Sequence, residues 1–113
     1  MAAPAIEQGY TTLLRQYVEE IARYRISAGE VEPQVIVDDD QYLLVQVGWQ
    51  GVRRVHGLTL HARLHDGKIW IEHDGSPAPG LALWLVEQGV PKADIVLAFQ
   101  PASVRPLSGF AVA

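Results

Sequence analysis

The chain has 113 residues, of which 49% are hydrophobic and 19% are charged, a composition typical of a globular protein. At this length we expect one domain spanning residues 1–113. Nine Lys and Arg against thirteen Asp and Glu give a net charge of −4, whereas a domain that grips nucleic-acid phosphates is normally basic. Any contact with nucleic acid is therefore expected to be indirect. The lack of cysteine excludes a disulfide framework, a thiolate metal site and a cysteine nucleophile.

The sequence gives no sign of a membrane or export segment. No apolar run approaches the ~18 residues that span a membrane. Residues 1–5 lack the charged and apolar regions of a signal peptide. We therefore expect a cytoplasmic protein that makes no contact with a membrane.

Apolar residues from Ile6 onward recur at gaps of three and four, which predicts an amphipathic helix. The apolar stripe consists of Ile6, Tyr10, Leu13, Leu14, Tyr17, Val18, Ile21 and Tyr24. Its tyrosines are interpreted as part of a core face, with their hydroxyl groups at the rim. Ser27–Gly29 is expected to end the helix, because glycine suits the left-handed conformation that follows a last turn.

The hydrophobic period then changes to two, which predicts β-strands joined by short turns. The expected strands cover residues 31–37, 42–49, 52–64 and 68–73. Asp38–Asp40, Gln50-Gly51 and Asp66-Gly67 are expected to form the turns, because Asp and Gly tolerate the backbone conformations that tight turns need. Three short connections in succession predict an antiparallel meander, and Pro33 places its first strand at an edge.

Side-chain alternation assigns residues of the two central strands to faces of the sheet. On the earlier strand, Leu43, Val45, Val47 and Trp49 share one face. On the later strand, Leu58, Leu60, Ala62 and Leu64 are expected to point inward, and Thr59, His61, Arg63 and His65 outward. One face of the meander is therefore apolar, and the first helix is expected to cover it.

The last third of the chain predicts a second helix and a short strand. Leu81–Val86 is expected to be helical and to stop before Gly89 and Pro91. Residues 95–99 favour a short strand or extended segment, and residues 109–113 are too apolar for a solvated tail, so they should dock on the core or on a partner. The sequence thus predicts an α+β fold with an N-terminal helix, a four-stranded antiparallel meander, a second helix, a short fifth strand and an apolar C-terminal tail.

Histidines suggest a metal site only weakly. His61 and His65 share a face of one expected strand, but at ~3.3 Å per residue they lie about 13 Å apart. His73 and Asp74 on the next strand would have to approach them across the hairpin. No helical His-Glu-x-x-His or facial-triad spacing is present, so outward-facing polar histidines are the favoured interpretation and no metal is predicted.

Other catalytic patterns are also weak. Asp38–Asp40 and Asp66-Gly67-Lys68 resemble the acid and the acid-x-Lys of a metal-dependent nuclease. Both lie in expected turns, at opposite ends of successive strands rather than side by side. The serines lack a Gly-x-Ser-x-Gly elbow, and no phosphate-binding glycine loop is present. We therefore expect no catalytic residue and no cofactor.

Tryptophan and arginine, which anchor protein interfaces, are prominent instead. Trp49, Trp70 and Trp84 occur with Arg53, Arg54 and Arg105. Trp70 alternates with Ile69 and Ile71, which places a large aromatic ring on the less buried side of its strand. Two interpretations remain open: helices pack on both faces of the sheet, or one face of the sheet is used for self-association or partner binding.

Several short motifs, in this order and spacing, resemble the XisI family, the fdxN element excision controlling factor proteins of cyanobacteria. The motifs are Gly48-Trp49, 53–57 (RRVHG), 67–71 (GKIWI), 73–75 (HDG), 85–99 (LVEQGVPKADIVLAF), Arg105 and 110–113 (FAVA). The resemblance runs from about Tyr10 to the C-terminus, nearly the whole chain.

The resemblance implies a small, dimeric α+β protein that controls programmed DNA excision during heterocyst development, while a separate recombinase cuts the DNA. It also implies a companion protein of the XisH type, which is similar to restriction-type endonucleases. We therefore predict a non-enzymatic regulatory subunit of such a partner. The predicted partner-binding residues are Trp49, Arg53, Arg54, His73, Asp74, Arg105 and Phe110.

Two departures from the family pattern limit how far the family's properties can be assigned to this chain. Gln100 stands where a histidine is expected, which removes any role that needs an imidazole, and Pro106–Ser108 is less polar than the usual form. Two alternatives stay open: a metal-dependent hydrolytic enzyme that uses the histidines with Asp74, and direct DNA binding through the combined arginines of an oligomer.

Overall fold

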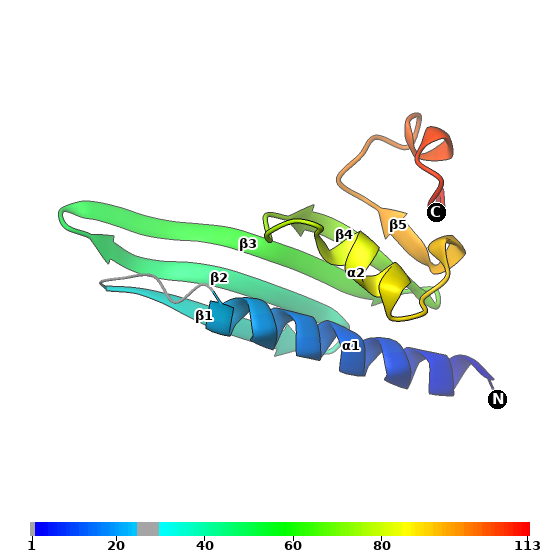
Figure 1. Ribbon diagram of the computed structural model, residues 1–113, viewed down its shortest axis with the longest axis horizontal. Helices are drawn as coiled ribbons and strands as arrows, with labels where there is room; N and C mark the ends of the chain where they lie inside the picture. Colours follow the sequence, from blue (N-terminus) through cyan, green and yellow to red (C-terminus); the bar gives the residue numbers. More distant parts are fainter. Residues whose placement is uncertain (1, 25–29) are drawn as a thin grey trace.

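Two helices lie against one five-stranded sheet in the computed structural model, which describes residues 2–24 and 30–113 (Figure 1). The elements are α1 (Ala2–Tyr24), β1 (Glu30–Asp38), β2 (Gln41–Gln50), β3 (Arg53–His65), β4 (Lys68–Asp74), α2 (Leu81–Glu87) and β5 (Ile95–Leu97), with short 3-10 turns at Lys92–Asp94 and Arg105–Leu107. The strands lie in the order β1-β2-β3-β4-β5. The predicted α+β fold is confirmed. None of the described helices is long and apolar enough to cross a membrane.

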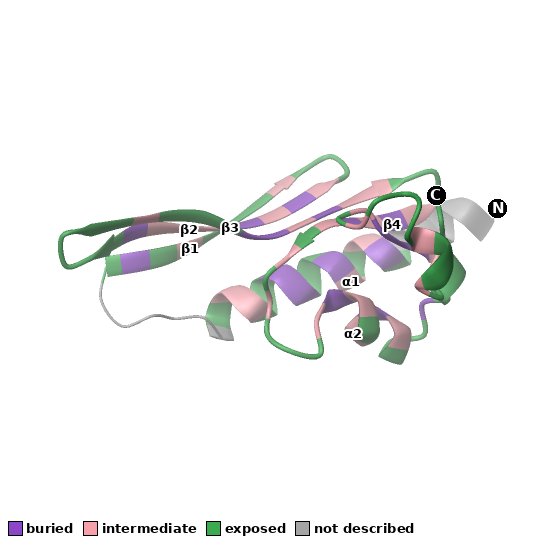
Figure 2. Ribbon diagram, turned by 90° about the horizontal axis from the view of Figure 1, so that it is seen from above, coloured by how far each residue is buried: buried purple, intermediate pink, exposed green. Residues whose placement is uncertain are grey.

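Both helices pack on the same face of the sheet (Figure 2). From α1 the buried residues are Tyr10, Leu14, Tyr17 and Val18, and from α2 they are Leu81 and Leu85. These side chains join one core cluster with Tyr42, Leu44, Leu60, Ala62, Ile69 and Ile71 of the sheet. The interpretation with helices on both faces is therefore wrong.

Helix α1 begins at Ala2, before the apolar stripe starts at Ile6. Alanine is a strong helix former and Pro4 is tolerated in a first turn, so the helix needs no apolar anchor there. The side chains of Ile6 and Tyr24 and the predicted stop at Ser27–Gly29 lie outside the described residues.

The first four strands form the predicted meander. Asp39 and Asp66 both have φ of 53°, the left-handed conformation that two-residue hairpins require, so their turn roles are confirmed. Strands β1 to β4 pair antiparallel, whereas β5 is parallel to β4. Strand β1 is an edge strand, as Pro33 predicted.

A β-bulge reverses the predicted faces in the middle of β3. Leu44 is opposite Leu60, but the next residue, Val45, is opposite Leu58, so Thr59 is an extra residue. Thr59 is consequently buried and Leu58 is 41% exposed, the opposite of the prediction, whereas Leu60 is inward as predicted. On β2, Leu43, Val45, Val47 and Trp49 do share a face, but that face is turned away from the helices.

The C-terminal segment docks on the protein's own sheet. The Ala111 amide donates to the carbonyl oxygens of Ile95 at 2.9 Å and Lys92 at 3.2 Å, and Ala111 forms a parallel bridge with Val96. Phe110 packs against the core cluster. The expected fifth strand ends at Leu97 rather than at residue 99.

Strands β2 and β3 continue well past the helices as a long hairpin (Figure 1). We call residues 45–58 of this hairpin the arm. Strand β4 pairs only with Leu60–His65 of β3, so it does not accompany the arm. The arm contributes to an elongated molecule whose longest dimension is 49 Å. We call the helix-free side of β1, β2 and β3 the open face.

Candidate protein-interaction surface

The structure separates the predicted interface residues into three places. Trp49, Arg53 and Arg54 lie at the end of the arm, and His73 and Asp74 lie at the end of β4. Arg105 and Phe110 belong to the C-terminal segment, beside β5. Around the arm group, residues 49–54 are all exposed, and residues 101–104, just before Arg105, form a second exposed stretch.

Trp49 and Arg54 form a stacked pair across the end of the arm. The two residues are directly opposite in the β2–β3 register. The Arg54 guanidinium lies 5.2 Å from the Trp49 ring centroid, and its Nη1 donates to the Gly48 carbonyl oxygen at 3.4 Å. Trp49 is still 44% exposed. The stack therefore holds a large aromatic ring in place at the surface, and a fixed ring costs less entropy on binding than a free one.

The turn beyond this pair carries an exposed apolar residue and a second arginine. Val52 is 98% exposed, and residues 49–54 are all exposed. Because side chains alternate along a strand, Arg53 and Arg54 lie on opposite faces of the arm. We call residues 50–53 the arm tip.

Gly48 explains how β1 approaches the arm so closely. A Cβ at this position would lie 1.8 Å from the Glu30 carbonyl oxygen, and Gly48 has φ of 155°. No other residue type fits that contact without moving the backbone. The glycine of the Gly48-Trp49 motif therefore positions the tryptophan beside it.

The arm also has an unpaired strand edge. Within the described part of the chain, no strand pairs with residues 53–58 of β3 on the β4 side, because β4 pairs only from Leu60 onward. A shallow groove of about 350 Å³ lies here, lined by Gln46, Gln50 and residues 53–59. Exposed edges of this kind accept an added strand from another chain.

Asp74 stabilises the connection between β4 and α2. Its Oδ2 accepts the Leu81 amide at 2.8 Å, at the start of α2, and its Oδ1 accepts the Ser76 amide at 2.9 Å and the Ser76 hydroxyl. The Tyr17 hydroxyl is 2.7 Å from Ser76 Oγ, which ties α1 to the same loop. Burial raises the pKa of the Tyr17 hydroxyl. His73 is exposed beside this network.

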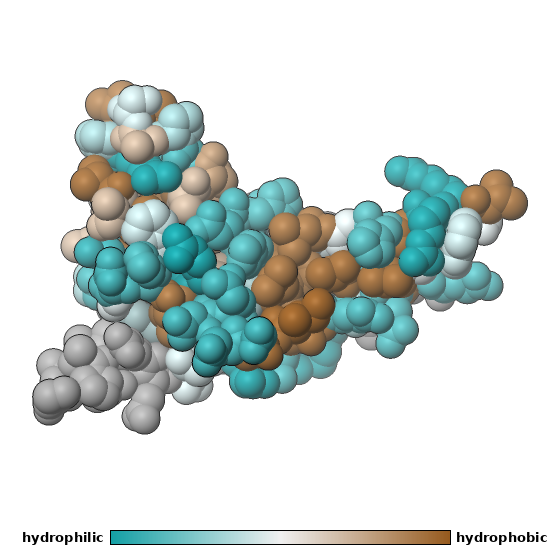
Figure 3. All heavy atoms as spheres, turned by 180° about the vertical axis from the view of Figure 1, so that it is seen from behind, coloured by the Kyte–Doolittle hydropathy of each residue, from teal (hydrophilic) through white to brown (hydrophobic). Residues whose placement is uncertain are grey.

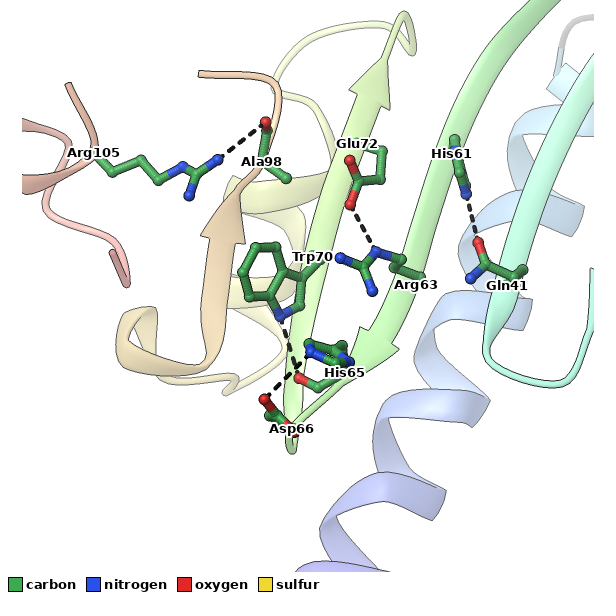
Figure 4. A network of polar contacts seen from close by, with 9 residues as sticks. All are labelled: Gln41, His61, Arg63, His65, Asp66, Trp70, Glu72, Ala98 and Arg105. Atoms are coloured by element: carbon green, nitrogen blue, oxygen red, sulfur yellow. Dashed lines mark hydrogen bonds and ion pairs between the residues drawn. The ribbon is translucent and has the colours of Figure 1, made fainter. Parts of the chain in front are cut away.

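Arg105 holds the C-terminal segment in place (Figure 4). Its Nε donates to the Gln100 carbonyl oxygen at 3.0 Å, and its two terminal nitrogens donate to Val112 and Ala98 carbonyl oxygens at 3.3 and 3.4 Å. The same guanidinium lies 5.8 Å from the Trp70 ring centroid, on the side opposite the helices. The Arg63 guanidinium lies 5.1 Å from the same centroid, so Trp70 is half-buried beside two arginines of its own chain. Lys92 lies 5.6 Å from the Phe110 ring centroid.

Several polar side chains of β2, β3 and β4 pair with one another (Figure 4). Arg63 Nε is 2.8 Å from a Glu72 oxygen, and His61 Nε2 is 2.6 Å from Gln41 Oε1. His65 Nε2 lies 3.3 Å from Asp66, and the His65 carbonyl oxygen accepts the Trp70 indole N–H. Within the described part of the chain, no group of three or more His, Cys, Asp or Glu side chains is placed to hold a metal ion.

The two acidic turns lie at the same end of the sheet, contrary to the sequence interpretation. The Leu64 amide, close to the Asp66 turn, donates to the Asp40 carbonyl oxygen at 2.9 Å. Alternate turns of a meander return to the same end, so this placement follows from the topology. Asp39 and Asp66 adopt the positive φ of turn residues, which accounts for their identity without catalysis.

The open face is the feature that sequence reasoning missed. Ile36 is 44% exposed and Leu58 is 41% exposed, and both lie on the same side as Val45 and Val47. An apolar area crosses this side of the molecule in Figure 3. The signal was present in the sequence, because residues 42–45 are apolar at both odd and even positions, which indicates a strand that is apolar on both faces.

Comparison with known proteins places this architecture among the excision-associated α+β proteins. The XisI protein family model matches residues 5–112, so the chain belongs to the XisI family. A crystal structure of a XisI-like protein from Anabaena variabilis superposes with a TM-score of 0.86 and 34% identity, covering 93% of this chain and 97% of that one. The fdxN element excision controlling factor XisI from Anabaena variabilis superposes with a TM-score of 0.79 and 32% identity, covering 92% and 96%. No curated protein matches the chain.

Proposed function

We propose that this protein controls programmed DNA excision as a non-enzymatic regulatory subunit that binds an endonuclease-like partner of the XisH type. The likeness to the fdxN element excision controlling factor supports the excision role. The observation that carries the binding role is the arm tip, an exposed turn with Val52 at its apex and Arg53 beside an unpaired strand edge. Protein contact through the arm suits an acidic chain, because its net charge of −4 opposes direct phosphate binding.

The proposed partner contact combines strand addition with an apolar anchor. A strand of the partner would pair with residues 53–58 of β3, where backbone groups lack a neighbouring strand. Val52 would fill a pocket on the partner, and Arg53 would meet a carboxylate.

The hydrolytic alternative is not favoured by the chemistry of its central carboxylate. Both oxygens of Asp74 already accept hydrogen bonds from the loop and from the start of α2. A metal or a substrate at Asp74 would have to displace these bonds. His61 is likewise engaged with Gln41.

Co-expression with an XisH-type protein tests the proposal. The wild-type chain is expected to form a stable mixed complex, measured by light scattering after gel filtration. Val52→Asp and Arg53→Glu are expected to weaken the complex about tenfold or more, because they place acidic groups in the contact. Arg15→Glu makes the same charge change at an exposed site on α1 and serves as the matched control. Equal affinity for all variants, or no complex at all, would contradict the proposal.

Salt-dependent gel shifts test the direct DNA alternative. The protein alone is expected to give no shift with duplex DNA at low salt. A steeply salt-dependent shift that Arg53→Glu abolishes would favour DNA binding by the arginines instead.

A further inference from the structure

The resemblance to the XisI family implies a dimer but not its interface, and we infer that a second copy of this chain covers the open face, with a twofold axis along β2. The inference does not depend on the proposed excision role or on an XisH-type partner. It starts from the apolar centre of the open face, where β2 contributes Leu43, Val45 and Val47. These side chains are only partly buried, and Ile36 and Leu58 on the flanking strands are exposed. A sheet that is apolar on both faces is normally covered on both.

The charges on the open face are arranged in three stripes. The strand register places Glu30 and Glu32 of β1 on one side of the apolar stripe, directly across from Trp49 and Val47 of β2. On the other side of the same two rows, Trp49 and Val47 are opposite Arg54 and His56 of β3. The face is therefore acidic along β1, apolar along β2 and basic or titratable along β3.

The stripes decide how a second copy fits. A twofold axis parallel to β2 lays β1 of one copy over β3 of the other and keeps each residue at the same height along the strands. Glu30 then faces Arg54 of the second copy, and Glu32 faces His56. At the far end of the face, Asp38 lies over Arg63 of the second copy, since both are in the row of Gln41, and Arg63 also pairs with Glu72 of its own chain. Each contact occurs twice, and the apolar stripes pack on one another.

The other simple arrangement is opposed by the same charges. A twofold axis across the strands would lay β1 over β1 and reverse the rows. Glu30 would then face Asp38 of the second copy, and Arg54 would face Arg63. Like charges in contact disfavour this packing, so the charge pattern selects the axis along β2.

The size of the face fits a reversible dimer. Three strands about 4.8 Å apart, at about 3.3 Å per residue over a nine-residue strand, give a face of roughly 14 by 30 Å. Side-chain relief brings the total buried area of two such faces to roughly 1,000 Å², which is in the range of weak, transient interfaces. The dimer is therefore expected to dissociate on dilution.

Sedimentation of the purified full chain over a concentration series tests the inference. The wild type is expected to pass from monomer to dimer as its concentration rises. Glu30→Arg replaces two attractive contacts with two repulsive ones and should weaken the dimer about tenfold. Adding Arg54→Glu to that variant should restore most of the affinity, because the exchanged charges face each other again across the interface.

Controls separate this dimer from other forms of association. Glu87→Arg makes the same charge change on the exposed side of α2 and should leave the dimer unchanged. Val47→Lys should abolish it, and a thermal unfolding curve will show whether that variant is folded. A wild type that stays monomeric would overturn the inference. A dimer that Glu30→Arg strengthens would also overturn it, because that result is expected of the twofold axis across the strands. A dimer that the charge changes leave unaffected would overturn it too, because that result is expected of pairing through the free edge of β3.

Discussion

The two ends of the sheet share the same strands but have opposite surroundings. Around Leu60, side chains of β2, β3 and β4 are buried against two helices in one core cluster. In the arm the same two central strands run on, and residues 49–54 are all exposed. The register shift at Thr59 separates the two regions. Stability therefore depends on the body of the sheet, while the arm is available for contacts with other molecules.

Leucine substitutions on either side of the bulge should show the largest difference in stability between the body of the sheet and the arm. Leu60→Ala removes a fully buried side chain and should lower the free energy of unfolding by about 3 kcal/mol. Leu58→Ala, two positions earlier and 41% exposed, should cost less than about 1 kcal/mol. Urea unfolding at protein concentrations that keep the chain monomeric measures both. Similar losses at the two positions would show that the arm belongs to the core.

Glycine substitutions test the one place where the arm is tightly packed. Gly48→Ala would put a methyl group 1.8 Å from the Glu30 carbonyl oxygen, and should cost about 2 kcal/mol or more. Gly57→Ala meets nothing within 4 Å and should be neutral or stabilise by about 0.5 kcal/mol, because alanine restricts the unfolded chain. The two variants should therefore differ by about 2 kcal/mol or more in the free energy of unfolding, which denaturant titration resolves. A harmless Gly48→Ala would mean that β1 does not hold the arm at this point.

Local turn and edge chemistry was predictable, whereas the register was not. Asp66-Gly67 and Pro33 specify a tight turn and an edge strand through their own backbone limits, and both occur as predicted. The bulge at Thr59 depends on a partner far along the chain, since the Thr59 carbonyl oxygen accepts the Gly75 amide at 2.7 Å. Alternation counted along β3 alone could not anticipate it, so Leu58 and Thr59 were assigned to the wrong faces.

In the candidate site, too, some features could be predicted from the sequence and others could not. A tight turn was predicted at Gln50-Gly51, but it lies one residue later, at Gly51-Val52. This shift pairs Trp49 with Arg54, whereas the predicted turn would have paired Trp49 with Val52. Arg105 and Asp74 were identified as notable residues from the sequence, but their contacts are with backbone atoms whose positions depend on the path of the whole chain. The structure gives both residues contacts that stabilise the body of the protein. The exposed members of the predicted set are Trp49, Arg53 and Arg54 on the arm and His73 at the end of β4.

Arg105→Ala should sharpen the distinction between stabilising and binding residues. Losing its bonds to the Gln100, Ala98 and Val112 carbonyl oxygens should cost about 1–2 kcal/mol. Hydrogen exchange should show faster exchange of the Ala111 amide, which is held beside Ile95. Arg15→Ala, exposed on α1, should change stability by no more than about 0.5 kcal/mol. An unaltered melting temperature combined with weaker partner binding would instead make Arg105 an interface residue.

The smallest effect concerns the hydrogen bond that ties α1 to the segment before β5. The Tyr10 hydroxyl donates to Asp94 Oδ2 at 2.5 Å, and Tyr10→Phe should cost about 1 kcal/mol near neutral pH. Burial, and then the bond and charge of Asp94, raise the pKa of Tyr10 to about 12 from its ordinary value of 10.0. Above about pH 10 the unfolded chain loses the Tyr10 proton while the folded chain keeps it, so the wild type loses stability as pH rises towards 12. Tyr10→Phe lacks this contribution, and its deficit relative to the wild type should shrink across that range. Urea titrations of both proteins on either side of pH 10 measure the difference, and a constant deficit would mean that Tyr10 titrates alike in the folded and unfolded chains.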